Sequence, residues 1–135
     1  VWGIPAGPEG IVDAPIGRSS KNRKKMAIVA NGKIAKTIYL VNKSWVASKV
    51  SLLDLELETG RTHQIRVHLS SIGNPVVGDE IYGGNRKNFT LSRQFLHACR
   101  LRFEHPRNGS ICEFESPLPE DLKNILSHLD EGEKI

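Results

Sequence analysis

The sequence predicts an α+β fold: a mixed, largely antiparallel sheet with flanking helices. Three patterns support this prediction. Leucines alternate with acidic residues over 50–58, as in a strand with one buried face. Ile65, Leu69 and Ile72 recur at the spacing of an amphipathic helix, so we expect them to face the core. A polar turn at 106–109 separates two further alternating segments, which predicts a hairpin.

Two more strands and a loop are expected before residue 50. Residues 11–16 form a short apolar run that Pro15 interrupts, which predicts a short strand. Residues 17–26 have no apolar period and are expected to form a loop. The segment 34–41 is rich in β-branched and aromatic residues and is expected to be a strand. The side chains on one of its faces are Thr37, Tyr39 and Val41.

Two helices are expected, with a long loop after the first. The first begins at Thr62 and ends before Gly73, a residue suited to the C′ position, with Pro75 just beyond. Residues 74–93 are mostly loop. The second helix runs from about Pro119, in its first turn, to about residue 129. Its apolar face is formed by Leu122, Ile125, Leu126 and Leu129.

The hairpin expected within 95–114 has a preferred register. A four-residue loop makes His105 and Ser110 opposite partners and avoids placing Glu104 against Glu113, a like-charge pair. The cross-strand pairs are then Arg100 with Glu115, Arg102 with Glu113, Leu101 with Phe114, and Phe103 with Cys112. The last two pairs are expected on a buried face.

The composition fits a single globular domain over 1–135, without a second domain. Hydrophobic residues make up 39% of the chain, which argues against disorder. No run approaches ~18 apolar residues, so we expect no membrane partner. Cys99 and Cys112 are too few for a disulfide framework and form no Cys-x-x-Cys pair. We therefore expect two buried thiols and a reducing, cytoplasmic compartment.

Positive charge is concentrated in one segment. The formal net charge is only +4, but residues 17–26 contain no acid. The basic residues of this segment are Arg18, Lys21, Arg23, Lys24 and Lys25. Such a cluster favours a polyanionic partner such as nucleic acid. A solvated basic loop is the alternative interpretation.

The strand-to-helix junction is the most unusual part of the sequence. Within eight residues it contains two arginines, two histidines and a glutamine: Arg61, His63, Gln64, Arg66 and His68. A helix N-terminus attracts anions, and arginine donates paired hydrogen bonds to carboxylate or phosphate. We therefore predict a functional site at this junction. A polar first turn on a surface helix is the alternative.

A metal site or a nucleophilic serine is poorly supported. His63 and His68 are five residues apart and diverge by about 140° on a helix that turns ~100° per residue. No cysteine or acid completes a ligand set with them, and His97, His105 and His128 are isolated in the sequence. The sequence also contains neither Gly-x-Ser-x-Gly nor a glycine-rich phosphate loop.

Several motifs resemble those of the RNA pseudouridine synthases that act on large-subunit rRNA and tRNA, the RluA-like family. The two longest are ETGRTHQIRVHL at 58–69 and GNPVVGDEIYG at 73–83. Shorter matches in the same order are DAPIGR at 13–18, NRKKM at 22–26, LHA at 96–98 and FESPLP at 114–119. Together they extend over most of the chain.

The resemblance implies isomerisation of uridine to pseudouridine in structured RNA, without a metal or cofactor. In this family the bond between C1′ and N1 breaks, the uracil turns, and it is reattached through C5. The family uses a nucleophilic aspartate, a basic residue paired with it, and a stacking tyrosine. Arg66 falls on the basic position, and Leu96 falls on an apolar position beneath the base. RNA-binding residues are then expected in the basic segment and at Arg61, His63 and Gln64.

One departure from the family is large. The nucleophilic aspartate of the family lies in an Arg-Leu-Asp motif, which this sequence does not contain. We therefore expect the chain to be the C-terminal half of a catalytic domain, with the N-terminal half as its partner and little activity alone. Arg66 should then be exposed, disordered, or paired with a substitute acid or anion. A non-catalytic RNA-binding module is the alternative, whereas a protein-interaction domain would leave the cluster around Arg66 unexplained.

Overall fold

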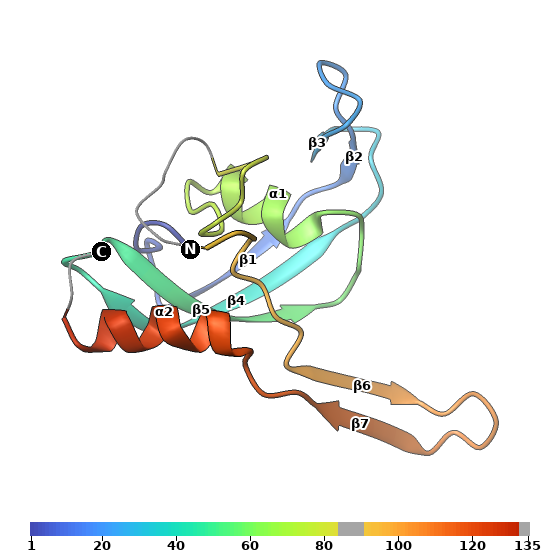
Figure 1. Cartoon of the computed structure of the whole chain (residues 1–135). Helices are drawn as coiled ribbons and strands as arrows, with labels where there is room; N and C mark the ends of the chain where they lie inside the picture. The colour runs from blue at the N-terminus through green and yellow to red at the C-terminus, as the bar shows by residue number, and fades with distance from the viewer. Residues whose placement is uncertain (84–90, 133–135) are drawn as a thin grey trace. The chain divides into compact units, whose positions relative to one another are not determined.

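The computed structural model describes residues 1–83 and 91–132. They form two compact units, Val1–Phe95 and Leu96–Glu133, and each unit is described by itself. Figure 1 shows the strands and helices of both units in chain order. The mixture of antiparallel sheets and two helices agrees with the predicted fold class.

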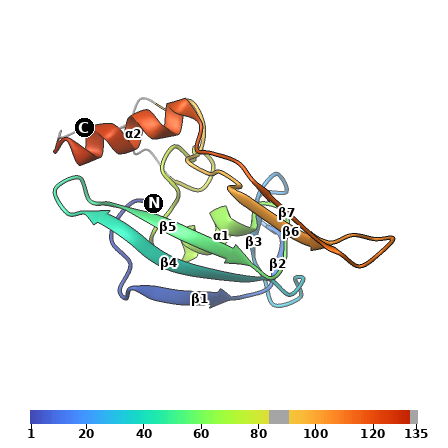
Figure 2. The same cartoon turned by 90° about the horizontal axis from the view of Figure 1, so that it is seen from below.

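A three-stranded antiparallel sheet forms the frame of the first unit. Strands β1 (Glu9–Asp13), β4 (Lys36–Trp45) and β5 (Val50–Leu57) lie side by side in the order β1-β4-β5 (Figure 2). The strands predicted over 34–41 and 50–58 are therefore confirmed. Strand β4 continues beyond its predicted end because a bulge between Val41 and Lys43 keeps it paired with β5.

The basic segment forms the end of a second, smaller hairpin. Strands β2 (Ile16–Arg18) and β3 (Met26–Ile28) pair in antiparallel fashion, with Arg18 opposite Met26. The prediction of a loop over all of 17–26 was therefore wrong at both ends. The single strand predicted over 11–16 was also wrong: β1 ends at Asp13, and β2 begins after Pro15, which has no N–H to donate to a ladder.

Helix α1 (Gln64–Ser71) packs on one face of the sheet (Figure 1). Its end follows the prediction. Gly73 has a φ of 85° and donates its N–H to Ser70, while Asn74 donates to Leu69. These two bonds form a Schellman motif, which satisfies the last carbonyl groups of the helix.

The buried face of α1 differs from the predicted stripe. The buried residues are Gln64, Val67, His68 and Leu69. Only Leu69 belongs to the expected stripe, since Ile72 is exposed and Ile65 is half-buried. The helix also begins two residues later than Thr62. Gln64 and His68 are buried because their hydrogen bonds are made within the protein, so polar side chains take up part of the buried face that the apolar spacing predicted for hydrophobic residues.

The second unit contains a hairpin and a helix. Strands β6 (Arg100–Glu104) and β7 (Ile111–Glu115) pair in the predicted register, and the N–H of His105 donates to the carbonyl of Ser110 at 2.7 Å. Helix α2 (Glu120–Asp130) buries Leu122, Ile125 and Leu129, as predicted, with Leu126 half-buried. Pro119 is the residue before the helix, so its predicted place within the first turn was wrong by one position.

The apolar side of the β6–β7 hairpin is not buried. Leu101 and Phe114 are each 59% exposed, and Phe103 is 41% exposed. The two phenylalanine rings stack on each other at 6.0 Å between centroids. Cys99 is exposed and Cys112 is half-buried. The predictions of a buried hairpin face and of two buried thiols were therefore wrong.

Neither of the two helices described is long and apolar enough to cross a membrane.

Candidate active site at the start of helix α1

The turn before α1 is built around the side chain of Gln64. Its amide oxygen accepts hydrogen bonds from the hydroxyl of Thr59 and the N–H of Arg61, at 2.7 and 3.0 Å. Its amide nitrogen donates to the carbonyl of Lys36 and the hydroxyl of Thr37, both at 3.0 Å. Gln64 therefore fixes the turn from inside the protein, between the end of β5 and the start of β4.

His68 continues this network one turn later. Its Nε2 lies 2.9 Å from the carbonyl of Ala14, which can only accept, so Nε2 carries the proton. Its Nδ1 lies 2.8 Å from the hydroxyl of Thr37 and therefore accepts. Because every polar atom of this buried ring is bonded within the fold, His68 ties α1 to the sheet and is not a metal ligand.

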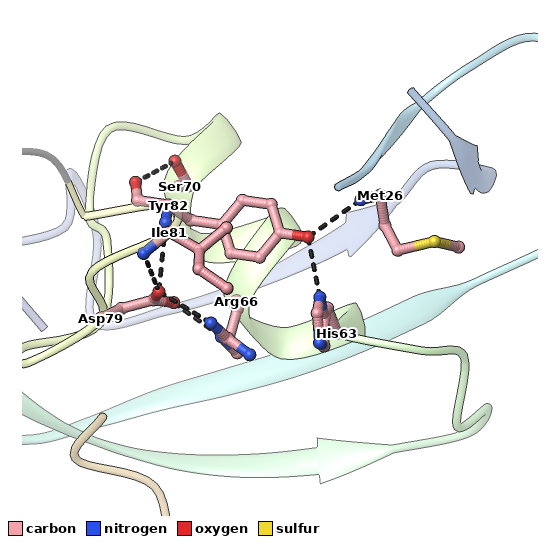
Figure 3. Close-up of polar contacts among 7 residues, drawn as sticks. All are labelled: Met26, His63, Arg66, Ser70, Asp79, Ile81 and Tyr82. Carbon is pink, nitrogen blue, oxygen red and sulfur yellow. Dashed lines mark hydrogen bonds and ion pairs between the residues drawn. The ribbon is translucent and has the colours of Figure 1, made fainter. Parts of the chain in front are cut away.

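Arg66 and Asp79 form a bidentate ion pair across the site. The Nε and Nη2 atoms of Arg66 donate to the two carboxylate oxygens of Asp79 at 2.8 and 2.9 Å (Figure 3). The Asp79 side chain is completely buried, and the Arg66 side chain is 12% exposed. Asp79 lies in the loop after α1, so this contact attaches that loop to the first turn of the helix.

Asp79 is held as a carboxylate despite its burial. Burial alone would raise the pKa of Asp79, since it penalises the charged form. Hydrogen bonds from Arg66 and from the N–H groups of Tyr82 and Ile81 outweigh burial and hold the pKa of Asp79 below its usual value. The same carboxylate raises the pKa of Arg66, which therefore stays charged.

The geometry of this pair leaves part of the guanidinium free for another partner. A guanidinium has five N–H donors, and Asp79 takes one from Nε and one from Nη2. The other edge, with Nη1 and the second N–H of Nη2, has no acceptor among the residues that the structure describes. Arg66 can therefore hold Asp79 on one edge and bind a second carboxylate or a phosphate on the other.

Tyr82 and His63 lie on the other side of Arg66. The Arg66 guanidinium carbon is 5.1 Å from the centre of the Tyr82 ring, a cation–π distance. The Tyr82 hydroxyl is 2.8 Å from Nδ1 of His63, as Figure 3 shows. Burial and the nearby charge of Arg66 lower the pKa of His63, and Asp79 opposes this only in part. His63 is therefore neutral at pH 7.

The basic hairpin contacts this cluster at Met26. Tyr82 also accepts a hydrogen bond from the N–H of Met26, the first residue of β3, at 2.9 Å. At the tip, Lys21, Arg23 and Lys24 are exposed, whereas the guanidinium of Arg18 donates to the carbonyl of Arg23. Lys25 is half-buried. The structure thus connects the site to Met26, the strand residue that directly follows the cationic tip of the hairpin.

The remaining predicted site residues have different surroundings. Arg61 donates from Nε to the carbonyl of Ile34 at 2.8 Å, and Gln64 lies inside the protein with its amide fully bonded. Leu96 belongs to the second unit. Over residues 1–83 and 91–132, no three side chains of metal-ligating type converge on one place. The roles assigned to Arg66, Leu96 and the RNA-binding residues stay predictions.

The sequence analysis assigned no role to Asp79 or Tyr82. Both lie within the motif at 73–83, and the partner of Asp79, Arg66, is 13 residues away in the sequence. One signal was available: Asp79 follows the run 74–77 with only Gly78 between them, and the residues of that run are all buried in the structure. An acid next to such a run needs a buried partner.

Comparison with known proteins agrees with these observations. The sequence profile of a family described as RNA pseudouridylate synthase matches residues 2–71, more than half of the chain. The chain belongs to this family. Among solved structures, the human protein RNA pseudouridylate synthase domain containing 1 aligns with a TM-score of 0.74 and 29% identity, covering 99% of this chain and 64% of that one. The predicted family and fold class are therefore confirmed.

Two bacterial relatives of the family are each 50% identical to this chain. One is a Chloroflexus aurantiacus protein named as an uncharacterized RNA pseudouridine synthase, which matches over 90% of this chain. The other is ribosomal large subunit pseudouridine synthase D of Nitrosomonas europaea, which matches over 87%. The matched parts are 38% and 36% of these relatives, so the chain spans little more than a third of their length.

Proposed function

We propose that the protein containing this chain isomerises uridine to pseudouridine in structured RNA. In this proposal the chain supplies Arg66 and the RNA-facing half of the site, and another segment supplies the nucleophilic aspartate. The membership of the chain in the pseudouridylate synthase family supports the reaction. The name of the Nitrosomonas relative favours ribosomal RNA over transfer RNA as the substrate.

The free edge of Arg66 is the observation that carries this proposal. Asp79 holds the guanidinium from one side, fixes its plane and leaves paired N–H donors directed away from Asp79. A second carboxylate on that edge would be aimed and kept ionised by two hydrogen bonds. Asp79 already neutralises the charge of Arg66. The two directed hydrogen bonds would therefore hold the second carboxylate more than any net attraction between its charge and that of Arg66.

The other half of the site binds RNA in this proposal. The exposed tip residues Lys21, Arg23 and Lys24 contact phosphates, and Arg61 and His63 line the approach to Arg66. Gln64 acts indirectly, since it positions Arg61 from inside the turn. Leu96 supports the base from below. No metal or cofactor takes part, since the isomerisation only moves the glycosidic carbon from N1 to C5 and exchanges a proton for it.

The exposed apolar face of the β6–β7 hairpin supports the proposal that another segment packs against this chain. A two-stranded hairpin is marginally stable in water, and side chains such as Leu101, Phe103 and Phe114 gain stability only when they are covered. We propose that the half of the catalytic domain that carries the nucleophile covers this face. The chain alone would then be incomplete both in its catalytic site and in its packing.

Release of tritium from RNA tests the proposed reaction. Attachment of the ribose at C5 expels the C5 hydrogen, so RNA with [5-³H]uridine releases tritium to water as pseudouridine forms. The complete protein is expected to release tritium from rRNA or tRNA, and residues 1–135 alone are not. Release by residues 1–135 alone would contradict our assignment of the nucleophile to another segment.

A non-catalytic RNA-binding module is the second candidate function. It is favoured by one observation, the absence of an Arg-Leu-Asp motif from all 135 residues. The sequence of the remainder of the protein discriminates between the two. If that remainder also lacks the motif, and the complete protein binds RNA without releasing tritium, the binding module is the correct interpretation.

A further inference from the structure

The Tyr82 hydroxyl connects three segments that are distant in sequence. It accepts a hydrogen bond from the N–H of Met26 at 2.9 Å, and it lies 2.8 Å from Nδ1 of His63. Met26 begins the strand that follows the basic tip of the hairpin, and His63 directly precedes α1. Figure 3 shows both contacts converging on this one oxygen atom.

One of these hydrogen bonds has a fixed direction, and the other depends on the tautomer of His63. The N–H of Met26 can only donate, so the phenol oxygen accepts from it. We assign the phenol proton to the bond with Nδ1 of His63, and the ring proton of the neutral histidine to Nε2, the tautomer in which Nδ1 accepts. Each group in this chain of bonds therefore has one defined role, and a phenylalanine in place of Tyr82 would remove both bonds at once.

The rest of Tyr82 contacts the ion pair. The N–H of Tyr82 donates to the carboxylate of Asp79 at 3.1 Å, and its ring lies 5.1 Å from the guanidinium carbon of Arg66. The ring also packs against a core cluster formed by Ile16, Ala35 and Val67. The hydroxyl of Tyr82 thus contacts the hairpin next to its tip, at Met26, whereas its ring and main chain contact the Arg66–Asp79 pair.

His63 needs such support because of its backbone. It has a φ of 55° and a ψ of 21°, the left-handed conformation that residues other than glycine rarely adopt. Its side chain makes no capping bond to the helix that it precedes. The bond to the Tyr82 hydroxyl and the edge-to-face contact of the two rings, 5.5 Å between centroids, hold the side chain of His63.

We propose that Tyr82 is a positioning residue that couples the RNA-binding hairpin to Arg66. Its hydroxyl holds the basic hairpin at Met26, next to the tip, and the start of α1, while its ring packs against the guanidinium that Asp79 orients. RNA bound by the hairpin tip is thereby held in register with the catalytic site. This inference rests on the proposed function for its effect on turnover, but its structural part can be tested separately.

Two substitutions in the complete protein separate the two ends of Tyr82. Tyr82→Phe removes both hydrogen bonds and keeps the ring, so the KM for RNA is expected to rise about three- to tenfold, the worth of one or two hydrogen bonds. The kcat is expected to fall by a smaller factor. Tyr82→Leu also removes the ring beneath Arg66, so its kcat is expected to fall further than that of Tyr82→Phe.

Tyr39→Phe is the matched control. Tyr39 is the other tyrosine of the chain, lies on β4, and its hydroxyl has no hydrogen-bond partner among the described residues. The substitution therefore removes the same atom without removing a hydrogen bond. KM and kcat of Tyr39→Phe are expected to match those of the parent, and an equal rise of KM in both phenylalanine variants would overturn the proposal.

Nuclear magnetic resonance gives a readout that does not depend on activity. In the parent, the Met26 amide should exchange slowly with solvent, and the ring nitrogens of His63 should report a proton on Nε2 and an acceptor at Nδ1. In Tyr82→Phe, the Met26 amide should exchange faster and the Nδ1 signal should shift. Unchanged exchange at Met26 would overturn the positioning role even if pseudouridine formation were slower.

The same measurements separate this inference from the proposed function. If the complete protein forms no pseudouridine, the proposed function fails, but the Met26 exchange and the affinity for RNA still report on Tyr82. If the protein is active and Tyr82→Phe raises neither the KM nor the Met26 exchange rate, the coupling through Tyr82 is wrong and the proposed function stands.

Discussion

At the scale of single residues, Asp79 determines how Arg66 is presented. A buried guanidinium without an acid would be costly, and an acid that used both of its edges would leave nothing to bind a nucleophile. Asp79 uses one edge only, and two main-chain N–H groups hold its own carboxylate in place. The expectation that Arg66 would be paired with a substitute acid is therefore met by a residue of the same chain.

Asp79→Asn tests this pair through the pH dependence of stability. The pKa of Asp79 is lowered from 3.8 in the folded protein, so its contribution to stability is complete above that value. This contribution is lost as the pH falls below 3.8 and passes through the pKa that Asp79 has in the folded protein. At pH 7, Asp79→Asn should lower the free energy of unfolding by about 3–5 kcal/mol, as when a buried pair is broken.

Urea unfolding between pH 7 and pH 2 measures both effects. The parent is expected to lose stability in acid more steeply than Asp79→Asn, so that the two curves converge. Parallel curves would mean that Asp79 contributes through packing and not through its charge.

Arg66→Lys tests the need for a guanidinium. Lysine keeps the charge, but its single nitrogen cannot bond both oxygens of Asp79 and a second carboxylate in fixed directions. In the complete protein we expect turnover to fall by about 100-fold or more, typical for a misplaced catalytic group, with little change in affinity for RNA. Arg66→Ala should be slower still.

Tritium release and RNA binding, measured together, decide the role of Arg66. Arg107→Lys, in the exposed turn of the β6–β7 hairpin, is the control for an arginine-to-lysine exchange. If Arg66→Lys lost binding and turnover in parallel, Arg66 would be a phosphate contact and not the partner of a nucleophile.

The residue scale also shows where sequence reasoning was limited. The concentration of arginines and histidines in a short stretch, a local signal, pointed to the junction, and the resemblance to the family selected Arg66 within it. Its partner Asp79 lies on a loop, and the contacts of Tyr82 extend to Met26, 56 residues away. Such long-range contacts depend on the tertiary fold, which the spacing of residue types along the sequence does not predict.

At the scale of elements, alternation and turn chemistry were the reliable signals. The strands β4 and β5 and the register of the β6–β7 hairpin were predicted because each depends on side chains next to one another. The buried face of α1 was predicted wrongly because Gln64 and His68 are buried by satisfying their hydrogen bonds within the fold. The spacing of apolar residues does not predict the burial of such polar side chains.

The tip of the β2–β3 hairpin is expected to set the salt dependence of RNA binding. Each phosphate contact releases counterions, so removing one should make the slope of log K against log salt shallower by roughly 0.7–0.9. Replacing Lys21, Arg23 and Lys24 with alanine should change the slope by about 2–3 in total. Arg18 is left intact because its guanidinium donates a hydrogen bond to the carbonyl of Arg23 and so stabilises the hairpin.

Lys123→Ala, on the exposed side of α2, is the control and should leave the slope unchanged. The slopes are measured from RNA affinities at several salt concentrations. An unchanged slope in the triple variant would mean that the tip is only a solvated basic loop.

Gly73 gives a test of the end of α1 that does not involve RNA. Its φ of 85° is left-handed, so alanine should cost about 1–2 kcal/mol, although nothing crowds a Cβ at that position. Gly60→Ala is the matched control, because Gly60 also has open space around it and lacks a positive φ. Urea unfolding of the two variants should therefore differ, and equal stabilities would contradict the Schellman motif.

At the scale of the whole molecule, unit Val1–Phe95 and unit Leu96–Glu133 differ in how complete they are. The first contains the sheet, α1 and the Arg66–Asp79 pair, with its buried polar groups satisfied. The second carries a hairpin whose apolar face is exposed. The alternating pattern predicted that face correctly but not its exposure, since alternation shows which side chains share a face and not what packs against them.

The last prediction tests whether another segment covers that face in the complete protein. Phe103→Ala and Phe114→Ala should each lower the free energy of unfolding by about 3–5 kcal/mol if the rings are fully covered there. They should change it by less than about 0.5 kcal/mol if the face stays in water. Ile111→Ala is the control, because Ile111 pairs with Glu104 on the opposite face of the same hairpin and is 53% exposed.

Urea unfolding of the three variants gives the comparison. Large losses of stability for the phenylalanine variants and a small one for Ile111→Ala would place a partner segment on the stacked rings alone. Small losses for all three would contradict the covering segment, and the nucleophile would then have to approach Arg66 without packing on this hairpin. Tritium release by the same variants separates these cases further, because a covering segment that also carries the nucleophile loses activity together with stability.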